Sequence, residues 1–151
     1  MKKPISEQLV AAATELYSSQ FVTGAGGNLS ARTGKTTWIS PSGFSFCDAL
    51  AKDYSQVDIL SSEVLSAGPR PSSELGMHLA IYREREDVEA IIHTHPPTTI
   101  ALTSSGIDLK PMFADYYVYL GKNVPHLDYI TVTTDELAIA VGKHFADFDC
   151  F

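Results

Sequence analysis

A glycine-rich segment, Gly24–Gly27, separates two hydrophobic periodicities near the beginning of the sequence. Before it, apolar residues recur every three or four positions over 5–17, which predicts an amphipathic helix. After it, short strand-like runs at 28–32 and 36–40 flank Gly34 and predict a hairpin. Because glycine adopts backbone angles that end a helix, the chain must change here from a helix to antiparallel strands.

The rest of the sequence alternates between strand-like and helix-like segments. We expect strands at 56–60 and 88–93, and helices at 72–85, 98–104 and 133–145. The apolar run 88–93 predicts a buried strand, and the second helix would begin at Ser72 or Ser73. Thr133 and Glu136 predict a capping box at the start of the last helix. This alternation predicts an α/β fold in a single domain over 1–151.

Composition narrows the classes of function. Of the 151 residues, 44% are hydrophobic and 19% are charged, as is usual for a folded globular domain. Lys and Arg total 11 against 18 Asp and Glu, and this net charge of -7 argues against nucleic acid and membrane surfaces as partners. The apolar runs are too short to span a bilayer. Cys47 and Cys150 have no metal or redox spacing, and with no signal-peptide pattern we expect a cytoplasmic protein.

The segment His93-Thr94-His95 is the sharpest chemical signal. Residues i and i+2 of a strand project from the same face, so both imidazoles would point into one space. Two imidazoles so placed suit a divalent cation, and Pro96-Pro97 puts them at a strand end, where pockets tend to open. The alternative is a pair of hydrogen-bonded histidines without a metal.

The segment Pro71-Ser72-Ser73-Glu74 predicts an anion site at the start of a helix. Two hydroxyls there lie beside unpaired backbone N–H groups and the positive end of the helix dipole, which suits a phosphate. The alternative is an ordinary N-cap. Beside the histidine pair, Glu74 becomes a candidate metal ligand or proton-transfer base. His78, one turn further along the same helix, is expected to pack in the core, and the alternative is that it supports this site.

Two glycine-containing turns, Gly26–Ser30 and Ser40–Gly43, are further candidates for ligand contact. Glycine lets a backbone approach a ligand closely, and the side-chain amide of Asn28 can donate a hydrogen bond. The second turn combines a hydroxyl with a glycine N–H. Each segment taken alone is better explained as a plain turn.

In this order, the segments Gly26–Ser30, Ile39–Gly43, Pro71–Glu74 and His93–His95 resemble the class II aldolase/adducin family. The best-known enzymes of that family are the bacterial fuculose-phosphate aldolases. The resemblance implies a three-layer α/β/α domain around a mixed, largely antiparallel sheet. It also implies a homotetramer and a divalent metal, usually zinc. Two imidazoles and a carboxylate suit manganese or cobalt as well.

The resemblance assigns roles residue by residue. The substrate phosphate would be held by Asn28, Ser42, Gly43, Ser72 and Ser73. His93 and His95 would bind the metal, and Glu74 would ligate it or act as acid and base. Asp115 and Tyr116 lie in a tyrosine-rich stretch that resembles proton-transferring segments of the aldolases and of related ribulose-phosphate 4-epimerases. The alternative for that stretch is a half-buried amphipathic aromatic element.

The implied activity is cleavage of a sugar phosphate, such as a ketose 1-phosphate, to dihydroxyacetone phosphate and an aldehyde. Breaking that carbon–carbon bond leaves an electron pair that a metal stabilises as a Lewis acid, while a carboxylate moves a proton at the same carbon. Alternatives on the same scaffold are a 4-epimerase, a dehydratase and a decarboxylase. A further alternative is an inert, adducin-like interaction module.

The sequence departs from the family pattern after the last predicted helix. The family's enzymes take a third metal-binding histidine from an Asn-His-Gly-like segment downstream of that helix, and the sequence reaches Phe151 without one. We therefore expect the chain to lack the C-terminal part of the family's domain. We also expect it to bind zinc weakly and to associate, because an open sheet edge favours pairing with another chain.

Overall fold

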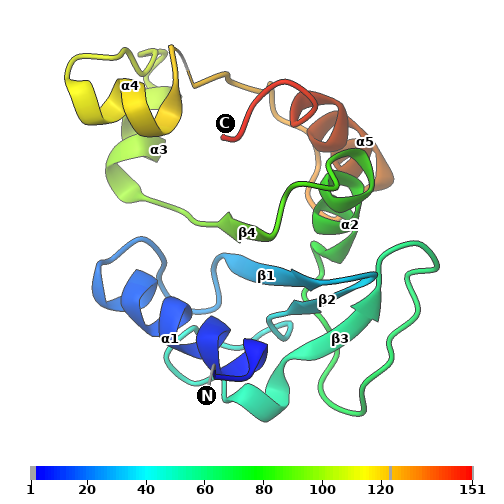
Figure 1. Cartoon of the computed structure of the whole chain (residues 1–151). Coiled ribbons are helices and arrows are strands. Elements are labelled where there is room, and N and C mark those ends of the chain that lie inside the picture. Colours follow the sequence, from blue (N-terminus) through cyan, green and yellow to red (C-terminus); the bar gives the residue numbers. More distant parts are fainter. Residues whose placement is uncertain (1–2, 123, 151) are drawn as a thin grey trace.

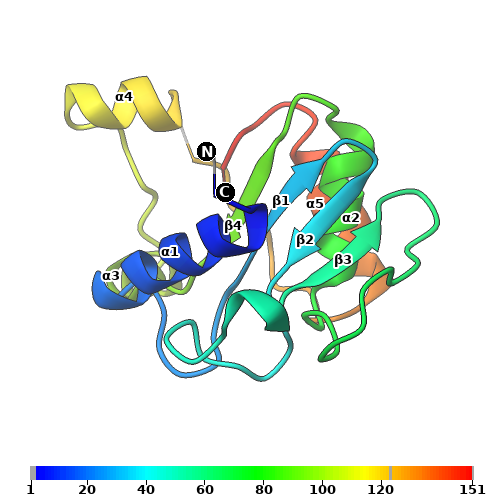
Figure 2. The same ribbon diagram turned by 60° about the horizontal axis from the view of Figure 1, so that its bottom comes forward.

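The computed structural model describes residues 3–122 and 124–150, which form a four-stranded antiparallel sheet with helices on both faces (Figure 1). The strands are β1 (Asn28–Thr33), β2 (Thr36–Ile39), β3 (Ser55–Asp58) and β4 (Ala90–His93), in the spatial order β3-β2-β1-β4. The helices are α1 (Ile5–Ser18), the 3-10 helix η1 (Ala51–Asp53), α2 (Leu75–Glu84), α3 (Pro97–Ser104), α4 (Ala114–Leu120) and α5 (Asp135–His144). Helix α1 covers one face of the sheet and α2 and α5 cover the other, which confirms the expected α/β/α layers (Figure 2).

Side-chain alternation along the strands divides the apolar core in two. In β1, Leu29 packs on the α1 side, whereas its neighbour Ser30 contacts side chains of α2, as the two-residue period of a strand requires. The core on the α1 side consists of Leu9, Ala13, Val22, Leu29, Phe46, Ala49 and Tyr54. The core on the α2 side consists of Ile39, Val57, Ile59, Met77, Leu79, Ile81, Tyr82, Ile91 and Val141.

The first half of the fold agrees with the sequence predictions. The helix predicted over 5–17 is α1, and the predicted hairpin is formed by β1 and β2, with Gly34 at a φ of +62° in its turn. The strand predicted at 56–60 is β3, which ends earlier, at Asp58. The carboxylate of Asp58 accepts hydrogen bonds from the backbone N–H groups of Leu60 and Ser61, so it closes a turn where the strand was expected to continue.

Two boundaries around the candidate site differ from the predictions. Strand β4 begins at Ala90 and forms one edge of the described sheet, so Ile92 is 56% exposed and the prediction of a buried strand is wrong. Helix α2 begins at Leu75 rather than at Ser72 or Ser73. The Ser72 hydroxyl accepts a hydrogen bond from the Glu74 N–H, and this local turn precedes the helix.

The predicted capping box of the last helix is also wrong. The cap of α5 is Thr134, whose hydroxyl accepts a 3.2 Å hydrogen bond from the backbone N–H of Leu137. Thr133 has a φ of +65°, whereas an N-cap residue adopts an extended backbone. With the cap moved by one residue, Glu136 no longer occupies the third position that a capping box needs.

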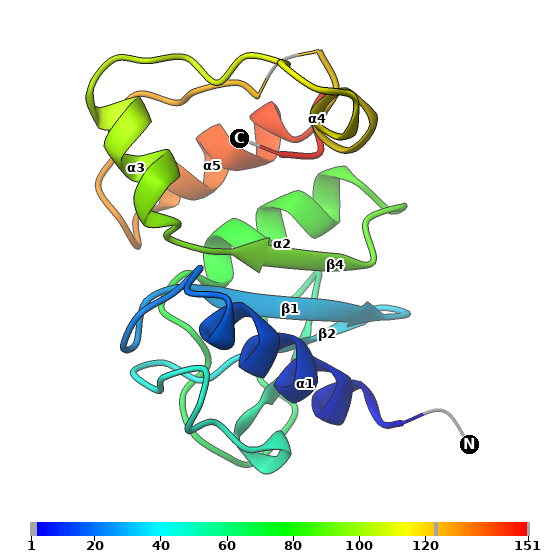
Figure 3. The ribbon, with the colours of Figure 1, turned by 90° about the vertical axis from the view of Figure 1, so that its left-hand side faces the viewer.

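Helices α3 and α4 lie beyond the β4 edge of the sheet (Figure 3). In α4, Tyr116 is buried and donates its hydroxyl to the carbonyl oxygen of Leu109 at 3.0 Å, while Val118 and Tyr119 are 72% and 78% exposed. This stretch is therefore an amphipathic aromatic helix. Within the described residues, none of the helices combines the length and the apolar character that crossing a bilayer requires.

Gly142 allows α5 to pack closely on α2. A Cβ at this position would lie 3.1 Å from the Cβ of Ala80 and 3.5 Å from its carbonyl oxygen. A Cβ on Gly76, in the same helix pair, would lie 3.7 Å from the Cβ of Ala138. Because α5 contributes Val141 to the core, this contact holds the last helix against the rest of the domain.

We predict that Gly142→Leu lowers the free energy of unfolding by about 1–3 kcal/mol, because the added side chain must push α5 away from Ala80. The exposed neighbour Lys143 provides a matched control, and Lys143→Leu should change that free energy by less than about 0.5 kcal/mol. Urea unfolding of the three proteins measures both effects. Equal stability of the two variants would contradict the close contact.

Candidate active site

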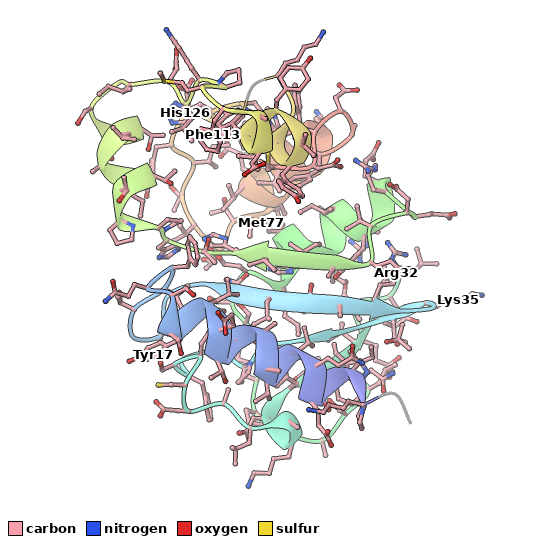
Figure 4. The ribbon with its side chains drawn as sticks, turned by 60° about the vertical axis from the view of Figure 1, so that its left-hand side comes forward. Tyr17, Arg32, Lys35, Met77, Phe113 and His126 are labelled. Atoms are coloured by element: carbon pink, nitrogen blue, oxygen red, sulfur yellow. The ribbon has the colours of Figure 1, made fainter. Side chains whose placement is uncertain are left out.

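The antiparallel pairing of β1 and β4 places Asn28 opposite His93. Gly27 has a φ of +75°, and a Cβ at this position would lie 2.7 Å from the carbonyl oxygen of His93 and 2.7 Å from Cγ1 of Val22. A side chain there would force β1 and β4 apart, so this glycine allows the start of β1 to approach the end of β4. Lys35, at the tip of the hairpin, marks the opposite end of the sheet (Figure 4).

His95 lies directly beside His93. Its backbone N–H donates to the carbonyl oxygen of Phe21 at 2.9 Å, which holds the segment after β4 against the segment after α1. The Nε2 atoms of the two imidazoles are 2.9 Å apart, and the rings meet edge to face with centroids 4.9 Å apart. The structure thus brings the two candidate metal-binding rings into one space.

Glu74 approaches His93 from the other side of its ring. The Oε2 atom of Glu74 lies 3.2 Å from His93 Nδ1 and accepts a 2.7 Å hydrogen bond from Asn28 Nδ2. Burial lowers the pKa of His93, and the Glu74 carboxylate opposes that effect. The carboxylate therefore does not face the same point as the two Nε2 atoms. Within residues 3–122 and 124–150, no group of three His, Cys, Asp or Glu side chains is arranged to hold a metal ion.

The hydrogen-bond chemistry of the histidine pair tests whether a cation fits. A neutral His93 that donates its Nδ1–H to Glu74 carries a lone pair on Nε2. That lone pair faces His95 Nε2 at 2.9 Å, so it requires either a proton on His95 or a shared cation. A Zn–N bond of about 2.0–2.1 Å allows both nitrogens to bind one ion at this separation. The pair therefore fits two ligand positions, with Glu74 placed as the carboxylate that orients a ligand imidazole.

The segments predicted to bind phosphate meet at the same end of the sheet. The backbone N–H of Ser72 donates to the carbonyl oxygen of Ser40, and that of Ser42 donates to the carbonyl oxygen of Arg70, both at 2.9 Å. Ser40 is in turn joined to β1, because its N–H donates to the carbonyl oxygen of Leu29. The two turns and the start of β1 are thus one hydrogen-bonded unit.

The groups of this unit differ in how available they are to a ligand. Ser72 is buried, and its hydroxyl is engaged by the Glu74 N–H, whereas Ser73 and Gly43 are exposed and Ser42 is half-buried. Asn28 is also buried and donates to Glu74. Ser73 and Glu74 line a small cavity of about 170 Å³ between the starts of α2 and α5.

His78, expected from the sequence to pack in the core, is also hydrogen-bonded to the site, as the alternative interpretation had it. It is fully buried, and its Nδ1 lies 2.7 Å from the hydroxyl of Ser30. Its Nε2 makes a short hydrogen bond with Oδ1 of Asn28. Burial lowers the pKa of His78 to about 3, so the ring is neutral. The spacing of four residues from Glu74 is the sequence signal that could have indicated this role.

Asp115 and Tyr116 are not brought to this group of side chains. Both lie on α4, which is separated from the start of α2 and the end of β4 in Figures 1 and 3. The Tyr116 hydroxyl is engaged by the carbonyl oxygen of Leu109. Their proposed part in proton transfer stays a prediction.

Comparisons with known proteins identify the family of the chain. The family described as "Class II Aldolase and Adducin N-terminal domain" matches residues 7–150. The chain is 36% identical over 143 residues to a 5-deoxy-D-ribulose 1-phosphate aldolase of Bacillus thuringiensis serovar kurstaki, covering 93% of this chain and 66% of that protein. It is 29% identical to an L-fuculose phosphate aldolase of Methanocaldococcus jannaschii, covering 93% of this chain and 76% of that protein.

A solved structure has the same fold. An L-fuculose 1-phosphate aldolase superposes with a TM-score of 0.87 at 30% identity, covering 98% of this chain and 70% of that one. The similarity therefore extends over nearly all of this chain. The chain spans about two thirds to three quarters of the length of these relatives.

The buried neutral His78 makes stability depend on pH. Its pKa is about 3 in the folded state against 6.5 for the ordinary group, so between these values the unfolded state binds a proton that the folded state does not. We predict that the stability contribution is fully present above pH 6.5 and is lost as the pH falls, by about 1.4 kcal/mol per pH unit below pH 6.

Urea unfolding of the metal-free protein between pH 7 and 4, compared with His78→Gln, measures this dependence. The variant lacks the titrating group and should lose less stability over that range. The same pH dependence in both proteins would contradict a buried neutral imidazole.

Proposed function

The chain belongs to the class II aldolase and adducin family, and we propose that it cleaves a ketose 1-phosphate to dihydroxyacetone phosphate and an aldehyde with the help of a divalent metal. The observation that carries the proposal is the convergence of His93, His95 and Glu74 at one end of the sheet. The names of the relatives, aldolases of 5-deoxy-D-ribulose 1-phosphate and L-fuculose phosphate, support this substrate class.

In this proposal His93 and His95 hold the metal through their Nε2 atoms. Zinc is the expected ion, and manganese or cobalt suits the same nitrogens. When bound, the ion supplies Lewis-acid polarisation of the substrate carbonyl. The Glu74 carboxylate fixes the His93 ring through Nδ1, so Nε2 keeps the lone pair that a metal requires.

Glu74 is also the proposed acid and base of the reaction. Its carboxylate lies against His93, and in this role it accepts and returns a proton at the carbon next to the substrate carbonyl. Ser42 and Gly43 in the turn after β2 and Ser73 in the turn before α2 offer hydroxyl and N–H donors for the phosphate. Asn28 and Ser72 are the further proposed contacts, and both also hydrogen-bond to Glu74. Anchoring the phosphate fixes the reacting end of the substrate against Glu74.

The proposal includes a cytoplasmic homotetramer. The exposed apolar surface around α4 supports association with another chain, since Met112 is 85% exposed and Phe113 is 65% exposed. Apolar side chains exposed together usually mark a contact with another chain. An inert interaction module is less well supported, because a purely structural domain would not need His93, His95 and Glu74 to converge.

We predict that the purified protein releases dihydroxyacetone phosphate from 5-deoxy-D-ribulose 1-phosphate or L-fuculose 1-phosphate, measured by coupled oxidation of a reduced nicotinamide. Chelation should abolish the release, and zinc, manganese or cobalt should restore it. His95→Ala should lower kcat/KM at least about a hundredfold, because two of the metal positions depend on the histidine pair.

The exposed His126 lies outside the site, so His126→Ala serves as the control and should keep its activity. Full activity after chelation would contradict the metal-dependent mechanism. Formation of an isomeric sugar phosphate would favour the epimerase alternative, and release of carbon dioxide from a keto-acid phosphate would favour the decarboxylase.

A further inference from the structure

A continuous series of hydrogen bonds runs from the core to the candidate site. Tyr82 and Ser30 are joined through their hydroxyls at 2.8 Å, and the Ser30 hydroxyl lies 2.7 Å from His78 Nδ1. The other ring nitrogen of His78 bonds to Oδ1 of Asn28, and Nδ2 of Asn28 donates to Glu74 at 2.7 Å. Side chains from β1 and α2 alternate along this series, so it also connects the sheet to the helix.

The bond between Asn28 and Glu74 sets the direction of the other bonds. Nδ2 of Asn28 donates to Glu74, so Oδ1 faces His78. Oδ1 also only accepts, which places the proton of neutral His78 on Nε2 and leaves Nδ1 as an acceptor. Ser30 has one hydroxyl proton and gives it to Nδ1, so its oxygen accepts from Tyr82.

Burial prevents these hydrogen bonds from reversing their direction. His78 and Ser30 are fully buried, and Tyr82 is 1% exposed. Burial also raises the pKa of Tyr82, which keeps the phenol protonated as a donor. Reversing one bond would leave a buried donor facing a donor or an acceptor facing an acceptor, and unpaired polar groups in a core are costly. A core that only had to be filled would use apolar side chains here.

We propose that His78 is a positioning residue that, locked in its Nε2–H tautomer by Ser30 and Tyr82, holds the Asn28 amide with its N–H toward Glu74 and thereby orients the catalytic carboxylate. Without the imidazole N–H, Oδ1 of Asn28 loses its buried partner, and only the bond to Glu74 still holds the amide. The proposal rests on the proposed function only for the role given to Glu74.

The tautomer can be measured without metal or substrate. The ¹⁵N chemical shifts and long-range couplings of the His78 ring in the metal-free protein should show a protonated Nε2 and an unprotonated Nδ1 at neutral pH. A protonated Nδ1, or averaging between the two tautomers, would overturn the proposal. This result does not depend on whether the protein is a lyase.

Two buried serines provide a matched pair of variants. Ser30 and Ser55 are both almost fully buried on strands, but the Ser55 hydroxyl donates to the carbonyl oxygen of Pro69, outside the series. Ser30→Ala should shift the His78 ring toward a mixture of tautomers, whereas Ser55→Ala should leave its spectrum unchanged. The same spectrum in both variants would show that Ser30 does not lock the ring, which contradicts the proposal.

Activity and metal binding test the effect on the site. His78→Leu should lower kcat and zinc affinity about ten- to a hundredfold, as loss of a group behind a metal ligand or catalytic residue does. His78→Gln keeps an N–H that can donate to Asn28 and should recover most of the loss. Equal losses in both variants would indicate a purely structural role and refute the proposal.

The two proposals fail separately. Lyase activity that is absent, or that chelation does not change, would refute the lyase even if the wild-type protein shows the expected tautomer. The zinc affinities of the His78 variants would then still test the positioning role. An active lyase in which His78→Leu retains both kcat and zinc affinity would refute the positioning role and leave the lyase.

Discussion

The pairing of β1 with β4 is the contact on which the rest of the site depends. Its register sets Asn28 opposite His93, and the left-handed Gly27 permits the approach because a Cβ there would collide with the His93 carbonyl oxygen. Strand β4 is also the edge at which the described sheet ends, so its last residues are open to a ligand on one side. A site at the end of a sheet edge has both a rigid base and access from solvent.

The Glu74 carboxylate orients the polar side chains that contact it. The Glu74 carboxylate is half-buried and accepts from Asn28 on one side while it lies against His93 Nδ1 on the other. It therefore decides which ring nitrogen of His93 carries a proton and which way the Asn28 amide points. The half-buried His93 and the fully buried His78 are both connected to this carboxylate, His93 directly and His78 through Asn28, which links the site to hydrogen bonds inside the core.

Local patterns in the sequence were sufficient for much of the fold. The periodicity of α1, the glycine boundary and the hairpin follow from neighbours within a few residues of one another, and four short motifs in order indicated the family. Residues whose partners are distant in the sequence were harder to interpret. The spacing of His78 from Glu74 indicates a shared helix face, but its partners Ser30 and Asn28 are about 50 positions away and have no local sequence signal. The cap of α5 was misplaced by one residue because the left-handed backbone of Thr133 has no sequence signal.

The proposed chemistry requires that His93 and His95 share one cation through Nε2 while Glu74 holds His93 through Nδ1. Anomalous X-ray diffraction at the zinc edge from crystals grown with zinc tests this most directly. We expect a peak about 2.0–2.1 Å from both Nε2 atoms, with the Glu74 carboxylate beside Nδ1 of His93. A peak elsewhere, or a protein without bound zinc in which a proton joins the two rings, would contradict it.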